Sequence, residues 1–289
     1  MGWGQSRECF KLWSDGEDGC YIASVDIDYY AQYFAFEQND WWFEARRRIV
    51  LELIASHGTG SNDHRSILDA GCGTGITLGY VERFGRAFGV DNEMVALKFC
   101  KTRNAKRLTC APLENLPFAD SSFDIVTCLD VIEHIEEDQS AITEIARVIR
   151  PGGLLILTVP AFQIFWSDHD VINHHKRRYR REQIRRLLAK SFEIELLSYY
   201  NIHLFPLAVL VRMLKRVEMM IWPSAHRKVE AENTYLPRSI NGLFSRIFGS
   251  EIFWLKRGSL PIGLSIICVA HKIEGSSGFA TQSPSDARP

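Results

Sequence analysis

The sequence has no apolar run that approaches the ~20 residues needed to cross a bilayer. Its first two dozen residues carry scattered charges and lack the apolar core of a signal peptide. The chain of 289 residues also has almost no net charge, −1 at pH 7, so we expect no global attraction to nucleic acid or to an anionic membrane. Together these absences favour a cytoplasmic protein.

The seven cysteines give no sign of a disulfide framework. Their number is odd, and several lie in predicted strands or in a glycine loop and not at paired spacings. We therefore expect free thiols and a reducing compartment. The composition, 46% hydrophobic and 24% charged, is ordinary for a globular chain and fits a single elaborated α/β domain.

Strand and helix patterns alternate along most of the chain, which predicts an α/β fold with a parallel sheet covered on both faces. We expect a tail at residues 1–24, a domain at 25–273 and a disordered tail at 274–289. Two helices, 28–38 and 41–56, precede the first strand. The predicted strands are Ser66–Ala70, Arg86–Val90, Arg107–Ala111, Phe123–Leu129, Leu154–Val159, Phe192–Tyr200 and Gly263–His271.

An insertion of about sixty residues, 201–261, separates the last two predicted strands. It mixes apolar and basic residues, among them Leu204–Lys215 and Met219–Trp222. We expect a helical cap over the active site, because insertions at strand tips lie over the pocket of such folds. The alternative is an interfacial helix that rests on a membrane surface.

A glycine loop follows the first predicted strand directly, in the stretch Ile67–Gly75. Gly71, Gly73 and Gly75 permit positive φ and close approach of the backbone to a ligand, and the helix that follows points its N-terminus at the loop. The next strand ends in Asp91, whose carboxylate can accept hydrogen bonds from both hydroxyls of a ribose. Together these features indicate an adenosine-type cofactor.

Five motifs in order resemble those of the class I S-adenosylmethionine-dependent methyltransferases. They are Ile67–Gly75, Gly89–Asp91, Leu116–Phe118, Ser122–Val126 and Arg150–Gly153. The resemblance covers roughly residues 40–200. It implies a Rossmann-like, seven-stranded, mostly parallel sheet with helices on both faces, an antiparallel last strand and S-adenosyl-L-methionine as the cofactor.

The resemblance also implies which residues bind the cofactor. Asp69, with the backbone of Gly71 and Leu129, would hold the amino end of the methionine part. Gly73, beside Cys72 in the loop, would allow the close approach.

On the nucleoside side, the resemblance implies that Asp91 takes the ribose diol, with Asn92 beside the adenine. Leu113 and Glu114 would flank the adenine ring. Pro112 departs from the family pattern, because many relatives have an Asp there that accepts from the adenine amine. We therefore expect adenine recognition to rest on backbone contacts and apolar packing.

The helix before the first strand carries Trp41, Trp42 and then three arginines. In related enzymes an arginine of such a helix can pair with the methionine carboxylate, so Arg46 or Arg47 would do so here, with Trp42 closing the pocket. The alternative is that the aromatic residues anchor the helix to the sheet and the arginines face water.

Asp130, Glu133 and His134 follow the fourth predicted strand. On a helical turn they would share one face, a geometry compatible with a divalent cation and similar to that of metal-using relatives. Relatives without a metal commonly show acidic residues and a Glu-His pair here too. We assign no metal ligand and take His134 as a candidate catalytic residue.

A histidine-rich and basic stretch follows the fifth predicted strand. His169 is the first candidate for a general base, with His174 as runner-up, since a neutral imidazole can take a hydroxyl proton. The basic residues from His174 to Arg186 would suit an anionic acceptor, although Arg181, Arg185 and Arg186 are expected to face water.

We conclude that the sequence predicts transfer of a methyl group to a small-molecule or lipid-linked acceptor, most simply at oxygen. A nucleic-acid methyltransferase is the first alternative, and net neutrality argues against it. A catalytically silent scaffold is the second, and the intact glycine loop argues against loss of cofactor binding. Contact with a membrane surface stays open.

Overall fold

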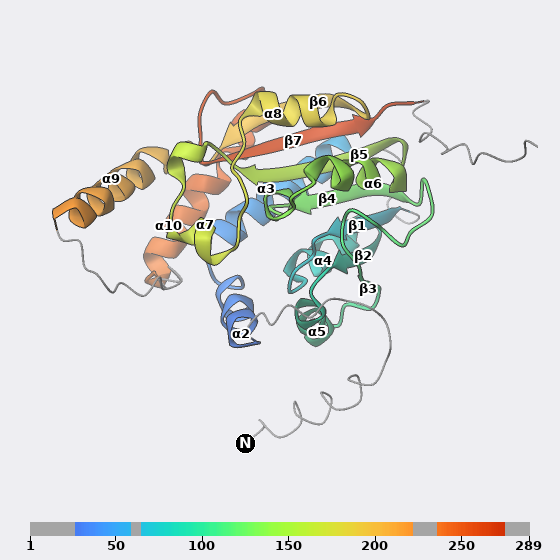
Figure 1. The fold of residues 1–289 in the computed structure, drawn as a ribbon, viewed down its shortest axis with the longest axis horizontal. Helices are drawn as coiled ribbons and strands as arrows, with labels where there is room; N and C mark the ends of the chain where they lie inside the picture. Colours follow the sequence, from blue (N-terminus) through green and yellow to red (C-terminus); the bar gives the residue numbers. More distant parts are fainter. Residues whose placement is uncertain (1–26, 59–64, 222–235, 275–289) are drawn as a thin grey trace, which may run out of the picture.

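The computed structural model describes residues 27–58, 65–221 and 236–274. Within them one seven-stranded sheet has the order β3-β2-β1-β4-β5-β7-β6 (Figure 1). The strands are β1 (Ser66–Ala70), β2 (Arg86–Asp91), β3 (Leu108–Cys110), β4 (Phe123–Leu129), β5 (Ile149–Pro160), β6 (Phe192–Tyr200) and β7 (Ser265–Lys272). β7 runs antiparallel to both of its neighbours, and the other pairings are parallel. The predicted fold is confirmed.

Helices cover both faces of the sheet (Figure 1). In chain order the α-helices are α2 (Ile27–Phe36), α3 (Trp41–His57), α4 (Ile76–Val81), α5 (Met94–Thr102), α6 (Asp138–Val148), α7 (Asp168–Ile172), α8 (Arg181–Leu188), α9 (Phe205–Ile221), α10 (Arg238–Gly249) and α11 (Ile252–Leu255). None of these described helices combines the length and apolar character that a membrane span requires.

The strands alternate their side chains between two apolar cores. In β1, Leu68 belongs to the core on the side of α6 and α8, whereas Ile67 belongs to the core on the side of α3, α4 and α5. This alternation follows from the two-residue period of a strand. The parallel strands therefore present their carboxyl ends at one edge, and the chain order reverses between β1 and β4 at that edge, where ligands bind in such folds.

The insertion between β6 and β7 contains α9, α10 and α11. α10 packs along α3, where the Trp41 ring meets the Phe244 ring edge-on at 5.6 Å and the Trp41 N–H donates to Asn241 at 2.8 Å. Buried Glu251 accepts from the backbone N–H groups of Asn201 and His203, at 2.6 and 2.9 Å, which ties the insertion to the end of β6. A cap over the active site stays a prediction.

Cysteine chemistry differs from the expectation at one position. Cys72, Cys100, Cys128 and Cys268 are free and buried, as predicted for a reducing environment. Cys110 is disulfide-bonded, so the expectation of free thiols throughout is wrong. Cys9 and Cys20 lie outside the described residues, as do the predicted tail at 1–24 and all but the first residue of 274–289.

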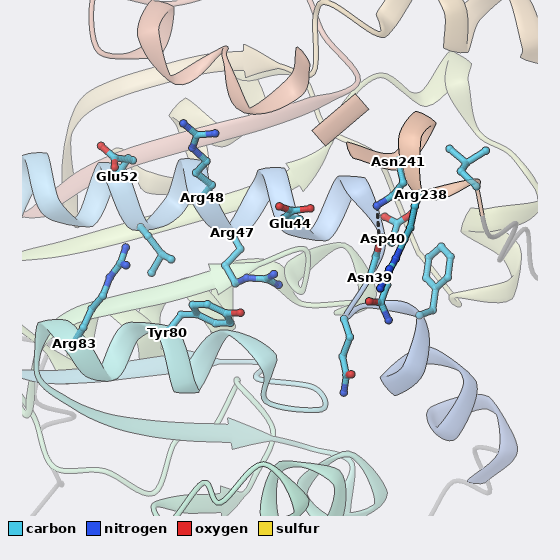
Figure 2. A pocket seen from close by; sticks show the side chains of 14 residues that line it. Asn39, Asp40, Glu44, Arg47, Arg48, Glu52, Tyr80, Arg83, Arg238 and Asn241 are labelled. Atoms are coloured by element: carbon cyan, nitrogen blue, oxygen red, sulfur yellow. Dashed lines mark hydrogen bonds between the residues drawn. The ribbon is translucent and has the colours of Figure 1, made fainter. Parts of the chain in front are cut away.

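A cavity of about 880 Å³ opens between α3, α4 and α10 (Figure 2). Its lining includes Arg47, Tyr80, Arg83 and Arg238, together with Glu44 and other polar side chains. None of the residues at the carboxyl edge that were predicted to bind the cofactor lines it. A second hollow, lined by Gly75 of the glycine loop, shares Gln38, Asn39 and Tyr80 with this cavity, so the cavity adjoins the loop.

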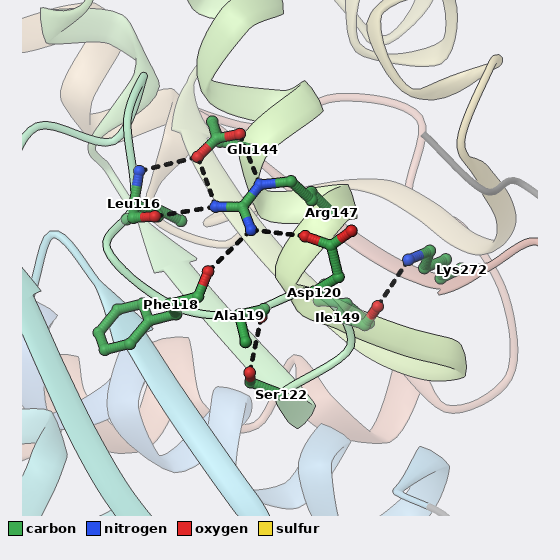
Figure 3. A network of polar contacts seen from close by, with 9 residues as sticks. All are labelled: Leu116, Phe118, Ala119, Asp120, Ser122, Glu144, Arg147, Ile149 and Lys272. Atoms are coloured by element: carbon green, nitrogen blue, oxygen red, sulfur yellow. Dashed lines mark hydrogen bonds and ion pairs between the residues drawn. The ribbon is translucent and has the colours of Figure 1, made fainter. Parts of the chain in front are cut away.

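Arg147, near the end of α6, fixes the loop that leads from β3 to β4 (Figure 3). Its guanidinium donates to the carbonyl oxygens of Leu116 and Phe118, at 2.8 and 2.7 Å, and it also pairs with Glu144 and Asp120. Glu144 in turn accepts from the Leu116 N–H at 2.8 Å. The loop also carries Leu113 and Glu114, the predicted adenine contacts, so this network fixes the segment in which they lie.

Arg147→Ala should lower the free energy of unfolding by about 2–3 kcal/mol, because it leaves carbonyl groups without their charged donor. Arg147→Lys should restore part of the loss, since a lysine can reach one carbonyl but not both. Urea denaturation measures the effect. Arg185→Ala is the control, because Arg185 pairs with Glu182 only on the exposed surface, at 3.6 Å, and should change stability by less than about 0.5 kcal/mol. Equal effects of the two alanine variants would contradict the anchoring role.

Candidate active site

The glycine loop connects β1 to α4. Two of its three glycines are packed against other residues, and the third is open to a ligand. Gly71, Gly73 and Gly75 have φ of 78°, 53° and 81°. A Cβ on Gly71 would come within 2.4 Å of Val131, and one on Gly75 within 2.7 Å of the Cys100 sulfur. A Cβ on Gly73 would meet nothing within 4 Å. The middle of the loop therefore leaves room for a ligand to approach the backbone.

Asp91 ends β2 beside this open glycine. Its Oδ2 accepts from the Gly73 N–H at 2.8 Å and its Oδ1 accepts from the Glu93 N–H at 2.9 Å. Burial raises the pKa of Asp91, although these backbone hydrogen bonds oppose the rise. Each carboxylate oxygen keeps a second lone pair, so the same group can accept from two further hydroxyls. Asn92, next in sequence, is exposed.

Asp69 lies deeper, at the carboxyl end of β1. The Thr127 hydroxyl donates to its Oδ1 at 2.6 Å, and only 3% of the residue is exposed. Burial raises the pKa of Asp69 to about 7 against the effect of that hydrogen bond. A cation bound beside Asp69 would favour the carboxylate and lower this pKa again. The position suits a ligand ammonium group.

The other predicted cofactor residues differ in how they face the edge. Leu113 and Leu129 are buried in the two cores, and Glu114 is exposed. The Cys72 thiol points to the Cys100 thiol at 3.9 Å, so Cys72 presents its backbone, not its side chain, to the loop. Their contacts with a cofactor stay predictions.

The two candidate arginines of α3 point in different directions. Arg46 is buried, forms an ion pair with Asp130 at the end of β4, and lies over the Trp42 ring at 4.5 Å. Arg47 lies over the Tyr80 ring at 4.5 Å and lines the cavity between α3, α4 and α10 (Figure 2). Arg46 therefore points to the carboxyl edge at Asp130 and Arg47 does not, while the pairing of Arg46 with a cofactor stays a prediction.

The expected helical face of Asp130, Glu133 and His134 is wrong. Asp130 has φ of 57°, and only the three residues Ile132–His134 form a turn, named η3, of 3-10 type. Asp130 pairs with Arg46 instead, while Glu133 is fully buried. Burial and the neighbouring Asp130 raise the pKa of Glu133 well above its usual range. Asp130 is therefore paired with the arginine of α3 and does not share a helical face with the other two residues.

Three histidines gather beside η3. The His134 and His175 rings meet edge-on with centroids 4.7 Å apart, and the His169 ring lies 6.0 Å from that of His175. His169 is on α7, and both it and His134 retain exposed edges. Partial burial, followed by the charge of His175, lowers the pKa values of His134 and His169 to about 4. The predicted catalytic histidines are thus brought together.

Sequence interpretation missed His175 and its partner Asp170. Asp170 is fully buried, lies 2.9 Å from His175 Nδ1, and accepts two hydrogen bonds from Arg178, at 2.7 and 2.8 Å. Arg177 pairs with Asp138, and the Arg181 guanidinium lies over the Tyr199 ring. Much of the basic stretch therefore serves internal contacts. The sequence signal that could have identified His175 was its spacing from Asp170, an acidic residue five positions earlier.

The matches to known proteins cover this same part of the chain. Residues 68–157 match the family model described as methyltransferase domain. A probable S-adenosylmethionine-dependent methyltransferase of Mycolicibacterium smegmatis is 28% identical over 55% of this chain and 62% of its own length. A ubiquinone biosynthesis O-methyltransferase of Alkalilimnicola ehrlichii is 32% identical over 34% of this chain and 43% of its own. The chain thus spans less than two thirds of the length of these curated relatives.

The fold also matches solved structures. The YcgJ protein of Bacillus subtilis superimposes with a TM-score of 0.50 at 21% identity, over 78% of this chain and 98% of that one. This likeness concerns the fold alone.

Asp69→Asn should change the pH dependence of stability. Because the folded pKa of about 7 exceeds the unfolded value, folded Asp69 holds a proton that the unfolded chain has lost. The wild type should therefore lose stability as pH rises from about 4 to 7 and level off above. Relative to Asp69→Asn, its free energy of unfolding should fall by roughly 2–3 kcal/mol between pH 5 and 7. Urea denaturation across this range measures the difference, and parallel curves would contradict the raised pKa.

Proposed function

We propose that this chain, whose residues 68–157 are a methyltransferase domain, binds S-adenosyl-L-methionine at the carboxyl edge of the sheet and methylates an oxygen of a small-molecule or lipid-linked acceptor. One observation carries the proposal. Gly73 is open to a ligand and donates its N–H to buried Asp91 at the end of β2, and the second buried carboxylate, Asp69, lies at the end of the neighbouring strand β1. The names of the M. smegmatis and A. ehrlichii relatives support it.

Each carboxylate suits a different part of the cofactor. Asp69, with its raised pKa, matches the ammonium of the methionine part, and Asp91 matches the ribose diol. Arg46 donates one guanidinium N–H to Asp130 and retains further donors for the methionine carboxylate. Trp42, stacked on that guanidinium, would close this end of the pocket.

The cofactor supplies an activated methyl group on a sulfonium. The chain's own task is to align the acceptor oxygen opposite the C–S bond, to exclude water and to take the acceptor proton as the new C–O bond forms. His169 is the proposed proton acceptor, because it is neutral at pH 7 and its ring lies beside His175, which in turn packs on His134 of η3 after β4. His134 is the second candidate.

An exposed apolar surface supports the lipid-linked class of acceptor. α9 begins beside the loop after β5, where Phe205 meets Phe165 with ring centroids 5.4 Å apart. Further along, α9 exposes Leu207, Leu210 and Met213 to solvent. Such a surface suits an acyl or prenyl chain, or contact with a membrane surface. The internal use of Arg177, Arg178 and Arg181 weakens the nucleic-acid alternative.

Asp91→Ala should abolish S-adenosylmethionine binding in calorimetry, since two ribose hydroxyls would lose their acceptor and Gly73 its partner. Glu193→Ala is the matched control, because this exposed carboxylate lies on the edge strand β6, and binding should be unchanged. Thermal unfolding of the free proteins separates a lost ligand contact from misfolding. Retained affinity in Asp91→Ala would overturn the ribose assignment.

His169→Ala should reduce methyl transfer roughly 100-fold or more while the affinity for the cofactor stays the same. The assay follows labelled methyl from the cofactor into the aqueous and lipid fractions of a cell extract, and the labelled product is then identified. His57→Ala, which removes an imidazole near the opposite edge of the sheet, controls for the loss of a histidine. An unchanged rate in His169→Ala would exclude it as the base, and absence of any labelled product would contradict the enzymatic proposal.

A further inference from the structure

One group of potential metal ligands lies next to the proposed cofactor edge. Glu133 and His134 come from η3, directly after β4, and His175 comes from the segment between α7 and α8. One ligand atom from each of the three lies within 4.8 Å of the other two. Two imidazoles and one carboxylate converge on a single point, although the sequence separates them.

Glu133 has an unmet electrostatic requirement. The residue is fully buried, and neither carboxylate oxygen has a hydrogen-bond partner on another residue in the described part of the chain. The neighbouring acids are already compensated, because Asp130 pairs with Arg46 and Asp170 pairs with Arg178. Burial of a carboxylate without such a partner costs several kcal/mol. A bound cation at this point would remove that cost.

His175 is held in the orientation that a ligand needs. Its Nδ1 lies 2.9 Å from Asp170 Oδ1, and that carboxylate has no protons to give because Arg178 and the Ser167 N–H also donate to it. Nδ1 therefore carries the hydrogen, and Nε2 keeps a lone pair. A histidine oriented by a carboxylate in this way is the usual arrangement around protein-bound metals. The His134 ring is similarly hydrogen-bonded to the backbone of Asn173.

We propose that Glu133, His134 and His175 bind one divalent first-row transition-metal ion. Two imidazoles and a carboxylate favour ions of the Zn²⁺, Co²⁺ or Mn²⁺ type over Mg²⁺ or Ca²⁺, which prefer oxygen ligands. Ligand atoms about 2.1 Å from a zinc ion are roughly 3.4 Å apart, so small side-chain rotations complete the site. His134 is exposed, which leaves an open coordination position toward solvent.

This ion would have a role in the proposed reaction, and that role rests on the proposed function. An acceptor hydroxyl bound at the open position would be oriented toward the cofactor edge and would become more acidic. The nearby His169 could then take its proton. The proposed acceptor is then a hydroxyl compound that can bind a transition metal. In this proposal His134 is a metal ligand and not a candidate base.

The test measures metal binding without any methyl acceptor. The full-length protein is dialysed against a chelator and titrated with Co²⁺, whose visible absorption reports coordination, and with Zn²⁺, counted by elemental analysis after gel filtration. We expect one ion per chain. His175→Ala and Glu133→Gln should each weaken binding by roughly 100-fold or more, and His57→Ala should bind as the wild type does.

Glu133→Gln keeps the test independent of misfolding. Glutamine keeps the size of the side chain and replaces a buried carboxyl group that has no partner, so the metal-free variant should be at least as stable as the wild type in thermal unfolding. A folded Glu133→Gln that binds Co²⁺ normally would overturn the proposal, as would a wild type that takes up no ion or a spectrum typical of cysteine ligation. If the ion binds but chelation leaves methyl transfer unchanged, the metal site stands and its role toward the acceptor fails.

Discussion

The burial of negative charge at the carboxyl edge of the sheet is the constraint on which the candidate site depends. Asp69, Asp91, Glu133 and Asp170 are all buried within a short distance of the strand ends. The protein satisfies them unequally: Asp170 has an arginine, Asp91 has two backbone N–H groups, Asp69 has one hydroxyl and Glu133 has no partner among the described residues. The carboxyl groups with the fewest protein partners are those to which we assign a positively charged ligand. An ammonium and a metal ion would meet the two acids that the chain serves least.

The sheet could be predicted almost completely, because its signals are local. Alternating apolar segments and the glycine loop after β1 set the strand sequence, and the family resemblance supplied the antiparallel last strand. The place of Asp91 followed for the same reason, since it needs only to end the second strand, and its contact with a ribose stays a prediction. Arg147, in contrast, donates to carbonyl groups about thirty residues away in the sequence, and no local sequence pattern predicts such contacts.

The acceptor side could not be predicted to the same degree, because it depends on pairs that form only after folding. Helical spacing grouped Asp130 with Glu133 and His134. In the structure Asp130 has a left-handed backbone and pairs with Arg46, so it does not share a helical face with those two residues. Arg46 and Arg47 are equivalent by composition, and the phase of α3 turns them to different sides. His175 enters the cluster only because Asp170 and Arg178 position its loop.

The contacts of α3 with residues late in the chain have a consequence for folding during synthesis. Trp41 and Asn241 are 200 residues apart, and Glu52 pairs with Lys256 across 204. During synthesis α3 leaves the ribosome before any strand of the sheet, yet the partners that fix both of its ends follow late in the chain. Arg46, midway between those anchors, reaches its final position only after nearly all of the domain has been translated. A nascent chain with the glycine loop already folded would still lack a fixed position for Arg46, the residue proposed to bind the methionine carboxylate.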